Sequence, residues 1–277
     1  MDLKKEVKEF WNSNPVDGLS EDVRLRIEYR KRKDRWMNDN ILPLEYKGSM
    51  LSVGCGQGTD IMSALQKIDT NDILIGLDIS LDSIRSALKG IKELSDEDSH
   101  IYFINGDAEK IPFNNGVFDT VWSFGVLHHT SDIRTALFEI KRVLKPGGKF
   151  YLMLYRSTCP KGIAVRFLRW LSQVLDRVTR QDFYLYTKLK ELKITQGHGT
   201  AFYELFGCPI LNLYSRSEVN YLLKDFKILK MELYESGIYQ ELVFLPKSLG
   251  FFVHIMNRLD PPKNIFGFHW VVIAEKE

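Results

Sequence analysis

The sequence predicts an α/β protein with a doubly wound, mostly parallel sheet. Short apolar runs alternate with helical stretches, each run is nearly continuous in apolar residues, and a glycine-rich turn follows the first run. A continuous apolar run is typical of a strand that is covered on both faces. Alternation of such strands with helices is typical of the crossover connections of a parallel sheet.

The alternation is clearest between residues 48 and 155. Strands are expected at 49–53, 73–77, 101–104, 120–124 and 149–154. Helices are expected between them at 60–67, 81–94 and 132–144. The sequence Lys145-Pro-Gly-Gly148 predicts that the last of these helices stops there and is followed by a turn.

The flanking segments predict a cap and two insertions. Residues 1–47 are expected to form a helical N-terminal cap, with a basic amphipathic helix at 21–36 that Ser20 caps. After Tyr155 the alternation stops, and the last two strands are expected at 226–233 and 268–274. We therefore expect one domain over 48–277, a seven-stranded sheet with insertions at about 157–225 and 235–266.

The composition excludes several classes of protein. The 277 residues are 44% hydrophobic and 27% charged, with a formal net charge of only +2, which gives no argument for a nucleic-acid partner. The three cysteines form no metal-binding spacing, and the charged N-terminus does not resemble a signal peptide. No apolar run is long enough to span a bilayer. We expect a cytoplasmic protein, with peripheral contact at the inner face of a membrane as the alternative.

The glycine-rich turn after the first strand is the strongest local signal. Gly54, Gly56 and Gly58 give a GxGxG spacing, and Thr59 stands where the dinucleotide fingerprint GxGxxG needs its third glycine. Glycines there let the chain turn tightly and let a ligand approach the backbone. A tight corner without a ligand is the alternative, and the threonine argues against an NAD-dependent oxidoreductase.

Two acidic residues follow the next two strands. Asp78 ends the second strand, and Asp107 follows the third. A carboxylate at the first place can accept hydrogen bonds from both hydroxyls of a ribose, and one at the second can accept from an adenine amino group. Asp78 also precedes a helix, so a capping role is the alternative. Because the carboxyl ends of parallel strands meet in one crevice, these loops together predict a site for a nucleoside-containing cofactor.

These motifs together resemble a known family. The stretches that carry the resemblance are Gly54-Cys-Gly56-Gln-Gly58, Gly76-Leu-Asp78-Ile-Ser80, Gly106-Asp107-Ala-Glu109, Pro112-Phe113, Phe118-Asp119 and Arg142-Val-Leu-Lys-Pro-Gly-Gly148. The chain is similar to class I S-adenosylmethionine-dependent methyltransferases of the ubiquinone and menaquinone biosynthesis group (UbiE-like, type 11). The resemblance covers residues 48–155. It implies a Rossmann-like fold and S-adenosylmethionine as cofactor, and leaves the acceptor open.

The resemblance also implies cofactor-binding residues. The glycine turn would pack against the methionine part of the cofactor, Asp78 would hold the ribose, Asp107 with Ala108 would hold the adenine, and Phe124 with its neighbours would face the sulfonium. The full set of cofactor residues predicted in this way is Gly54, Cys55, Gly56, Gly58, Asp78, Ile79, Asp107, Ala108, Ser123 and Phe124.

The acceptor is expected just beyond the fourth strand. His128 and His129 lie there, and either is a candidate base for an acceptor that must lose a proton. Capping the next helix or bracing the loop is the alternative role for this pair. No carboxylates that would complete a metal site are evident, so no metal is predicted. A catalytically inactive cofactor-binding protein remains a rival hypothesis.

Further candidates lie in the cap and the insertions. Contacts to the substrate or a lid role are predicted for Trp11, Tyr29, Arg30 and Arg216, with Ser215 or Ser217 as the cap of a helix at the last of these. Residues 161–193 look helical and basic, with eight Lys or Arg against three Asp or Glu, a net of +5. We interpret them as a lid, and a helix on an anionic membrane is the alternative. The expected partner is a small-molecule or lipid-like acceptor and not nucleic acid, and no oligomeric state is predicted.

Overall fold

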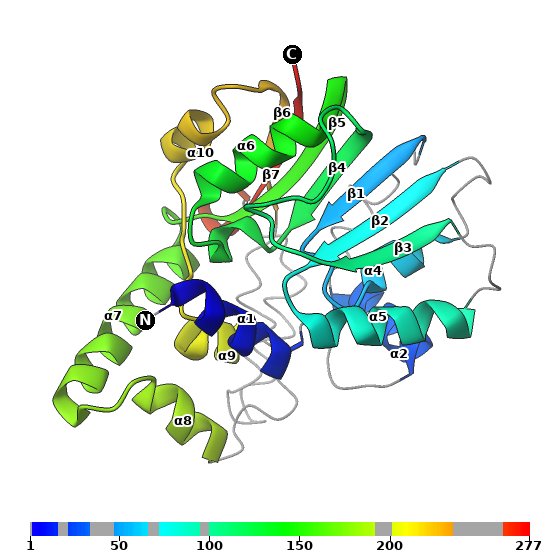
Figure 1. Cartoon of the computed structure of the whole chain (residues 1–277). Coiled ribbons are helices and arrows are strands. Elements are labelled where there is room, and N and C mark those ends of the chain that lie inside the picture. Colours follow the sequence, from blue (N-terminus) through cyan, green and yellow to red (C-terminus); the bar gives the residue numbers. More distant parts are fainter. Residues whose placement is uncertain are drawn as a thin grey trace.

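The computed structural model describes residues 2–15, 22–33, 47–65, 72–94, 100–191, 201–234 and 263–277. Its centre is a seven-stranded sheet with the strand order β3-β2-β1-β4-β5-β7-β6 (Figure 1). The strands are β1 Ser49–Val53, β2 Ile73–Asp78, β3 Ile101–Asn105, β4 Phe118–Phe124, β5 Leu144–Tyr155, β6 Lys227–Tyr234 and β7 His269–Glu275. The first five are parallel, and β7 runs antiparallel to both of its neighbours.

Helices cover both faces of the sheet, which confirms the doubly wound prediction. The helices α2 (Val23–Lys33), α4 (Thr59–Ser63) and α5 (Leu81–Leu94) lie on one face, and α6 (Ile133–Val143) and α10 (Arg216–Leu222) lie on the other (Figure 1). Each face buries its own hydrophobic cluster. Strand β1 serves both clusters, because Met50 packs into one and Leu51 into the other, as alternation along a strand requires.

The order in which the chain adds strands to the sheet reverses between β1 and β4. From β1 the chain winds outward through β2 to β3, and it then returns to place β4 on the other side of β1. Loops at the carboxyl ends of β1 and β4 therefore diverge to opposite faces and leave a crevice, where open α/β sheets bind their ligands.

The insertion after β5 folds into separate helices. The stretch 161–193, which was expected to be helical, forms two helices in its described part, α7 (Pro160–Thr179) and α8 (Tyr184–Glu191). Arg180 and Phe183 both have a φ of 54°, a left-handed conformation that ends a helix. The insertion continues with α9 (Ala201–Gly207) and reaches α10 through an extended segment.

Several expected boundaries shift. Helix α4 ends at Ser63, and β5 begins at Leu144, so the stretch expected to be a turn is the start of a strand. Helix α2 is capped by Asp22, whose carboxylate accepts from the backbone of Arg24, and the predicted cap Ser20 lies outside the described residues. Most of the second insertion, residues 235–262, also lies outside them, and the short helix α13 (Lys263–Phe266) precedes β7.

The N-terminal helix α1 (Leu3–Ser13) links the sheet domain to the insertion. Asn12 accepts a hydrogen bond from the Ser80 hydroxyl at 2.8 Å, and the ring of Phe10 lies 6.3 Å from that of Tyr186 on α8. Its position in Figure 1 is at the carboxyl ends of the first strands. None of the helices in the described part of the chain is long and apolar enough to cross a membrane.

Candidate functional site

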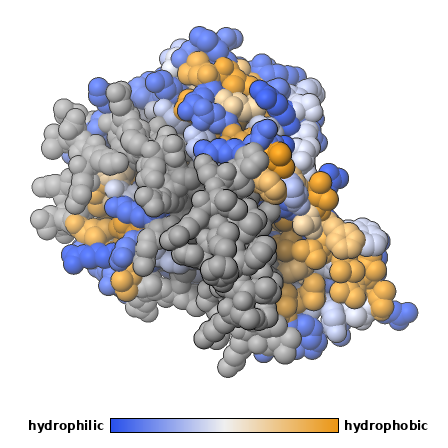
Figure 2. All heavy atoms as spheres, turned by 180° about the vertical axis from the view of Figure 1, so that it is seen from behind, coloured by the Kyte–Doolittle hydropathy of each residue, from blue (hydrophilic) through white to orange (hydrophobic). Residues whose placement is uncertain are grey.

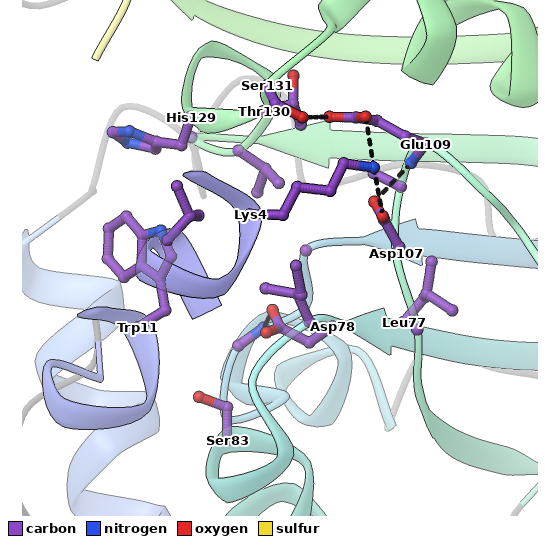
Figure 3. Close-up of a pocket in the computed structure, with 18 of the residues that line it drawn as sticks. Lys4, Trp11, Leu77, Asp78, Ser83, Asp107, Glu109, His129, Thr130 and Ser131 are labelled. Carbon is purple, nitrogen blue, oxygen red and sulfur yellow. Dashed lines mark hydrogen bonds and ion pairs between the residues drawn. The ribbon is translucent and has the colours of Figure 1, made fainter. Parts of the chain in front are cut away.

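A cavity of about 820 Å³, its open mouth included, lies at the carboxyl ends of β1, β2, β3 and β4. Helix α1 forms one wall of it, and the loops that follow the four strands form the rest (Figure 3). The lining residues are Lys4, Val7, Trp11, Pro15, Gly54, Gly56, Leu77, Asp78, Ile79, Ser83, Gly106, Asp107, Ala108, Glu109, Gly125, Val126, His129, Thr130 and Ser131.

The glycine turn brings bare backbone to this cavity at two of its three glycines. Gly54 and Gly56 line the wall, and both have a positive φ, 75° and 55°. A side chain at Gly54 would collide with Val126, whereas the space around Gly56 is open. Gly58 does not line the cavity. It begins α4 with a φ of 74°, and a side chain there would meet the ring of Phe103.

Asp78 connects the glycine turn to the start of α5. One carboxylate oxygen accepts from the Gly56 amide and the other from the Ser80 amide, each at 2.8 Å. Burial raises the pKa of this carboxyl, and the two amides partly oppose that effect. A carboxylate has about four lone-pair positions, so about two remain for a ligand in the cavity. The predicted capping role and a ligand role are therefore compatible.

Two further carboxylates, those of Asp107 and Glu109, line the cavity on the other side from Asp78. Lys4 of α1 reaches Asp107 at 2.8 Å and Glu109 at 2.6 Å, as the dashed lines in Figure 3 show. The other oxygen of Glu109 accepts from the Ser131 hydroxyl and the Asp132 amide. Burial lowers the pKa of Lys4, but the two carboxylates outweigh it and raise that pKa above its ordinary value. Helix α1 is thereby attached to the acidic corner of the site.

Six of the ten predicted cofactor residues line the cavity: Gly54, Gly56, Asp78, Ile79, Asp107 and Ala108. Besides Gly58, the other three have structural contacts. Ser123 is fully buried and donates to the Val53 carbonyl, and Phe124 packs in the core beside Trp122. Cys55 lies within the glycine turn, between Gly54 and Gly56, and its amide donates to the Leu77 carbonyl.

Of the four predicted substrate or lid residues, only Trp11 lines the cavity. Arg30 instead forms a two-bond ion pair with Asp60 on α4, at 2.9 and 2.8 Å, which holds α2 against the sheet domain. Tyr29 lies beside it on α2 and is partly exposed. Arg216 is exposed at the first turn of α10, where Ser215 and Glu218 form the capping box. Ser215 is therefore the N-cap of α10, which is one of the two alternatives that the sequence predicted.

The two histidines occupy different positions at the end of β4. His129 lines the cavity, with its ring 5.0 Å from that of Trp11. His128 is fully buried behind it and stacks on Tyr155 at 4.0 Å. Glu204 of α9 meets both, its Oε1 being 3.0 Å from Nε2 of His129 and 3.9 Å from Nε2 of His128. The structure thus provides the carboxylate that the sequence did not place near these residues.

Burial and neighbouring charges shift the pKa values of His128, His129 and Glu204 in different directions. Burial lowers the pKa of His128 to about 4, and the neighbouring His129 adds to the effect. Burial also lowers the pKa of His129, but the Cys208 sulfur and the Glu204 carboxylate outweigh it and raise the pKa above its ordinary value. The pKa of Glu204 is correspondingly held below its usual range, because both histidines outweigh the effect of its burial.

Sequence reasoning missed several cavity residues for identifiable reasons. Gly106 and Glu109 belong to the stretch that contains Asp107, and Gly125 follows Phe124. Their position next to predicted site residues could have indicated them. Lys4 and Glu204 had no such signal, because nothing in a sequence shows which residue of a remote helix meets a given loop. Their positions depend on how α1 and α9 pack.

Comparison with known proteins defines the class. Residues 51–152 match the family model described as a methyltransferase domain. The geranyl diphosphate methyltransferase solved with geranyl diphosphate and sinefungin superposes with a TM-score of 0.60 at 13% identity over the whole of both chains, which is a likeness of fold. The fold and the domain match together show a class I methyltransferase domain, of the kind that binds S-adenosylmethionine.

Two curated relatives match part of the chain. The 27-O-demethylrifamycin SV methyltransferase of Amycolatopsis mediterranei is 28% identical over 145 residues, which is 52% of each chain. The demethylmenaquinone methyltransferase of Lactococcus lactis is 37% identical over 101 residues, 36% of this chain and 39% of the relative. A relative from menaquinone biosynthesis is thus among the matches, in agreement with the group that the motifs resemble. The matched part spans about half or less of each relative.

The residues of the cavity fit S-adenosylmethionine. Gly56 leaves open space where a side chain would otherwise stand, so that the cofactor can lie against the backbone. Asp78 and Asp107 keep unused lone pairs at the places where the resemblance predicts contacts to ribose and adenine. No phosphate-binding cluster of basic residues faces the site among the described residues, since Lys4 is the only lysine or arginine that lines it.

Proposed function

We propose that the protein transfers a methyl group from S-adenosylmethionine to a small-molecule acceptor. The observation that carries this proposal is the convergence of Gly56, Asp78 and Asp107 on one cavity within a methyltransferase domain. The cofactor, when bound, supplies a methyl group that is already activated by a sulfonium.

The residues of this chain then have three tasks. Asp78 orients the cofactor through its free lone pairs, and it is itself held in place by the Gly56 and Ser80 amides. Helix α1 excludes water from the cavity, with Val7 and Trp11 in its wall. Positioning and exclusion of water can supply much of the rate when the leaving group is already activated.

The acceptor is proposed to lie at the end of the cavity where Trp11 and His129 meet. This end combines an indole ring, the apolar Val126 and the hydroxyl of Thr130. The relatives act on acceptors as unlike as a rifamycin and a demethylmenaquinone, according to their names. Transfer to oxygen, nitrogen, carbon or sulfur therefore stays open. A catalytically inactive cofactor-binding protein is the alternative outcome of an activity assay.

A direct base role is less well supported for His128 than for His129. His128 has no face on the cavity, so an acceptor proton cannot reach it there. His129 does face the cavity, but its Nδ1 lies 2.7 Å from the Ile210 carbonyl and its Nε2 3.0 Å from Glu204. We therefore propose that His129 shapes the acceptor end of the cavity, with Glu204 as the residue that positions it.

A lipid-like acceptor at a membrane surface is the second candidate. The observation in its favour is an exposed apolar face on α7, where the side chains of Ile163, Phe167, Trp170 and Val178 are each more than half exposed. A lipid-like acceptor lies in the bilayer, so an enzyme that binds to the membrane surface can reach it.

Calorimetric titration of the full chain with S-adenosylhomocysteine, S-adenosylmethionine and NAD tests the cofactor assignment. We expect binding of the two sulfur compounds and none of NAD. Asp78→Asn should weaken that binding at least about tenfold, because a charged acceptor of two hydrogen bonds becomes a neutral amide. Asp82→Asn, an exposed change on the next helix, is the matched control and should bind as the wild type does. Equal loss in both variants, or binding of NAD alone, would overturn the proposal.

A further inference from the structure

A cluster of potential metal ligands lies against the acceptor end of the cavity. His128, His129 and Glu204 each offer one ligand atom, and these atoms all lie within 4.8 Å of one another. The two histidines come from the 3₁₀ turn η2 (Leu127–His129) after β4, and the glutamate comes from α9 in the insertion. Glu204 is only 12% exposed and the histidines are buried, so the cluster lies beneath the surface.

The polar atoms of this cluster do not satisfy one another. Both ring nitrogens of His128 and the Oε1 atom of Glu204 are buried without a hydrogen-bond partner in the structure. Oε1 lies 3.0 Å from Nε2 of His129, but that approach lacks hydrogen-bond geometry. Leaving buried polar atoms of this kind without partners costs stability, because they have lost their hydrogen bonds to water. Three side chains therefore converge on one point that none of them fills.

The remaining contact of His129 is the one that a metal-bound histidine makes. Its Nδ1 lies 2.7 Å from the Ile210 carbonyl, which can only accept, so Nδ1 carries the hydrogen. The lone pair of the neutral ring is then on Nε2, which faces Glu204. A metal-ligating histidine commonly donates its other N–H to a backbone carbonyl in this way.

The donor set indicates the class of metal. Two imidazoles and one carboxylate suit zinc and neighbouring divalent transition metals, and three protein ligands leave at least one coordination position open. Magnesium and calcium prefer oxygen ligands and fit this set poorly. Of the three side chains, His129 is the one that lines the cavity, so the cluster adjoins it.

We propose that His128, His129 and Glu204 bind one divalent transition-metal cation, of which Zn²⁺ is the natural representative, in the wall of the acceptor end of the cavity. The alternative is a metal-free ion pair, in which a proton on Nε2 of His129 faces the Glu204 carboxylate. That alternative leaves both nitrogens of His128 unsatisfied, whereas a shared cation uses one atom of each residue. The proposal does not depend on methyl transfer, because metal binding alone tests it.

The test is a titration of the chelator-treated full chain with Co²⁺, followed by its visible d–d absorption, and with Zn²⁺, followed by calorimetry. We expect one bound metal per chain. Glu204→Gln and His128→Asn should each weaken the binding at least about tenfold, which is a conservative expectation for the loss of a direct ligand, since changes to residues that only support ligands already cost about 10–100-fold. His100→Gln changes an exposed histidine outside the cluster and should bind as the wild type does.

Two controls keep the result interpretable. Glu204→Gln is nearly isosteric and removes a charge, so it is expected to fold, and circular dichroism verifies this for each variant. Cys208→Ser tests the other buried donor, whose sulfur lies 3.4 Å from the opposite nitrogen of His129, and it should leave the cobalt spectrum unchanged. Absence of metal binding in the folded wild type would overturn the proposal. Binding that persists unchanged in both ligand variants, or a thiolate band that Cys208→Ser removes, would also overturn it.

Discussion

At the scale of single residues, the acidic corner of the cavity is already partly occupied. Lys4 lies between Asp107 and Glu109, and Glu109 is only 8% exposed, so this contact is better shielded from water than an ordinary surface ion pair. Adenine is proposed to bind Asp107, which also receives this ammonium group. Asp107 keeps unused lone pairs, but the ammonium group of Lys4 draws on the same charge and weakens this carboxylate as an acceptor for the cofactor.

Lys4→Met should consequently tighten the binding of S-adenosylhomocysteine. The expected gain is at most about fivefold, because an ion pair of this exposure contributes about 0–1 kcal/mol. Lys5→Met is the matched control, since Lys5 is exposed on the same helix and makes only a loose 3.9 Å pair with Glu9. The measurement is calorimetric titration at low salt. Weaker binding in Lys4→Met alone would show that the lysine supports the bound cofactor and does not compete with it.

At the scale of elements, Asp119 connects three adjacent strands. It begins β4 beside Phe118, accepts from the amide and hydroxyl of Ser49 on β1, and pairs with Lys145 on β5 at 2.7 Å. Burial raises the pKa of this carboxyl, but Lys145 and Ser49 outweigh it and hold the pKa below its ordinary value. One carboxylate thus links β1, β4 and β5 at the end of the sheet opposite the cavity.

Asp119→Asn should lower the free energy of unfolding by about 1 kcal/mol at neutral pH, because the side chain is 39% exposed and its contacts are screened. The lowered pKa stabilises the fold above the unfolded value of about 3.9, and this contribution is lost as the pH falls through the folded value. The difference from wild type should therefore shrink below about pH 4. Urea unfolding at several pH values measures it, with the exposed Asp225→Asn as control. A difference that stays constant down to pH 3 would contradict the assignment.

At the scale of the whole molecule, α7 presents an apolar face to solvent. Seen from behind, apolar residues gather on the side of the molecule where α7 lies (Figure 2). The rings of Phe167 and Trp170 lie 5.8 Å apart on this helix in a tilted arrangement, and both side chains are 57% exposed. Arg169 is not available to a lipid headgroup, because its guanidinium donates to the carbonyls of Leu205 and Cys208 and so holds α9 in place. The exposed apolar face and the exposed Arg166 and Arg177 are the parts of α7 that remain available to a membrane.

Cosedimentation with anionic and neutral vesicles tests this surface. If it docks on an anionic bilayer, the double change Phe167→Ser and Trp170→Ser should reduce the bound fraction at least about tenfold, since burying one such ring contributes about 1.5–3 kcal/mol. Phe138→Ser removes an equally exposed ring from α6 and is the matched control. Equal binding by all three proteins, or none by the wild type, would leave α7 as a lid over the site.

Much of the fold was predictable from sequence, because a strand that is buried on both faces is a nearly continuous apolar run in the sequence. All seven strands were expected close to their observed places, and α5 was expected at its observed bounds. The break between α7 and α8 was missed because left-handed residues at Arg180 and Phe183 carry no glycine to announce them. The start of β5 was missed because pairing with a neighbouring strand decided it, against a Pro-Gly-Gly sequence that favours a turn.

The sequence by itself determined the fold class and the cofactor corner of the site. Both depend on residues that lie at strand ends, and the ends of adjacent parallel strands meet wherever such a sheet forms. Only the tertiary structure decided which of those residues face the cavity, that Lys4 enters it from α1, and that Glu204 joins His128 and His129 from α9. These contacts join segments far apart in the chain, and their formation depends on how helices pack, which no local pattern of residues specifies.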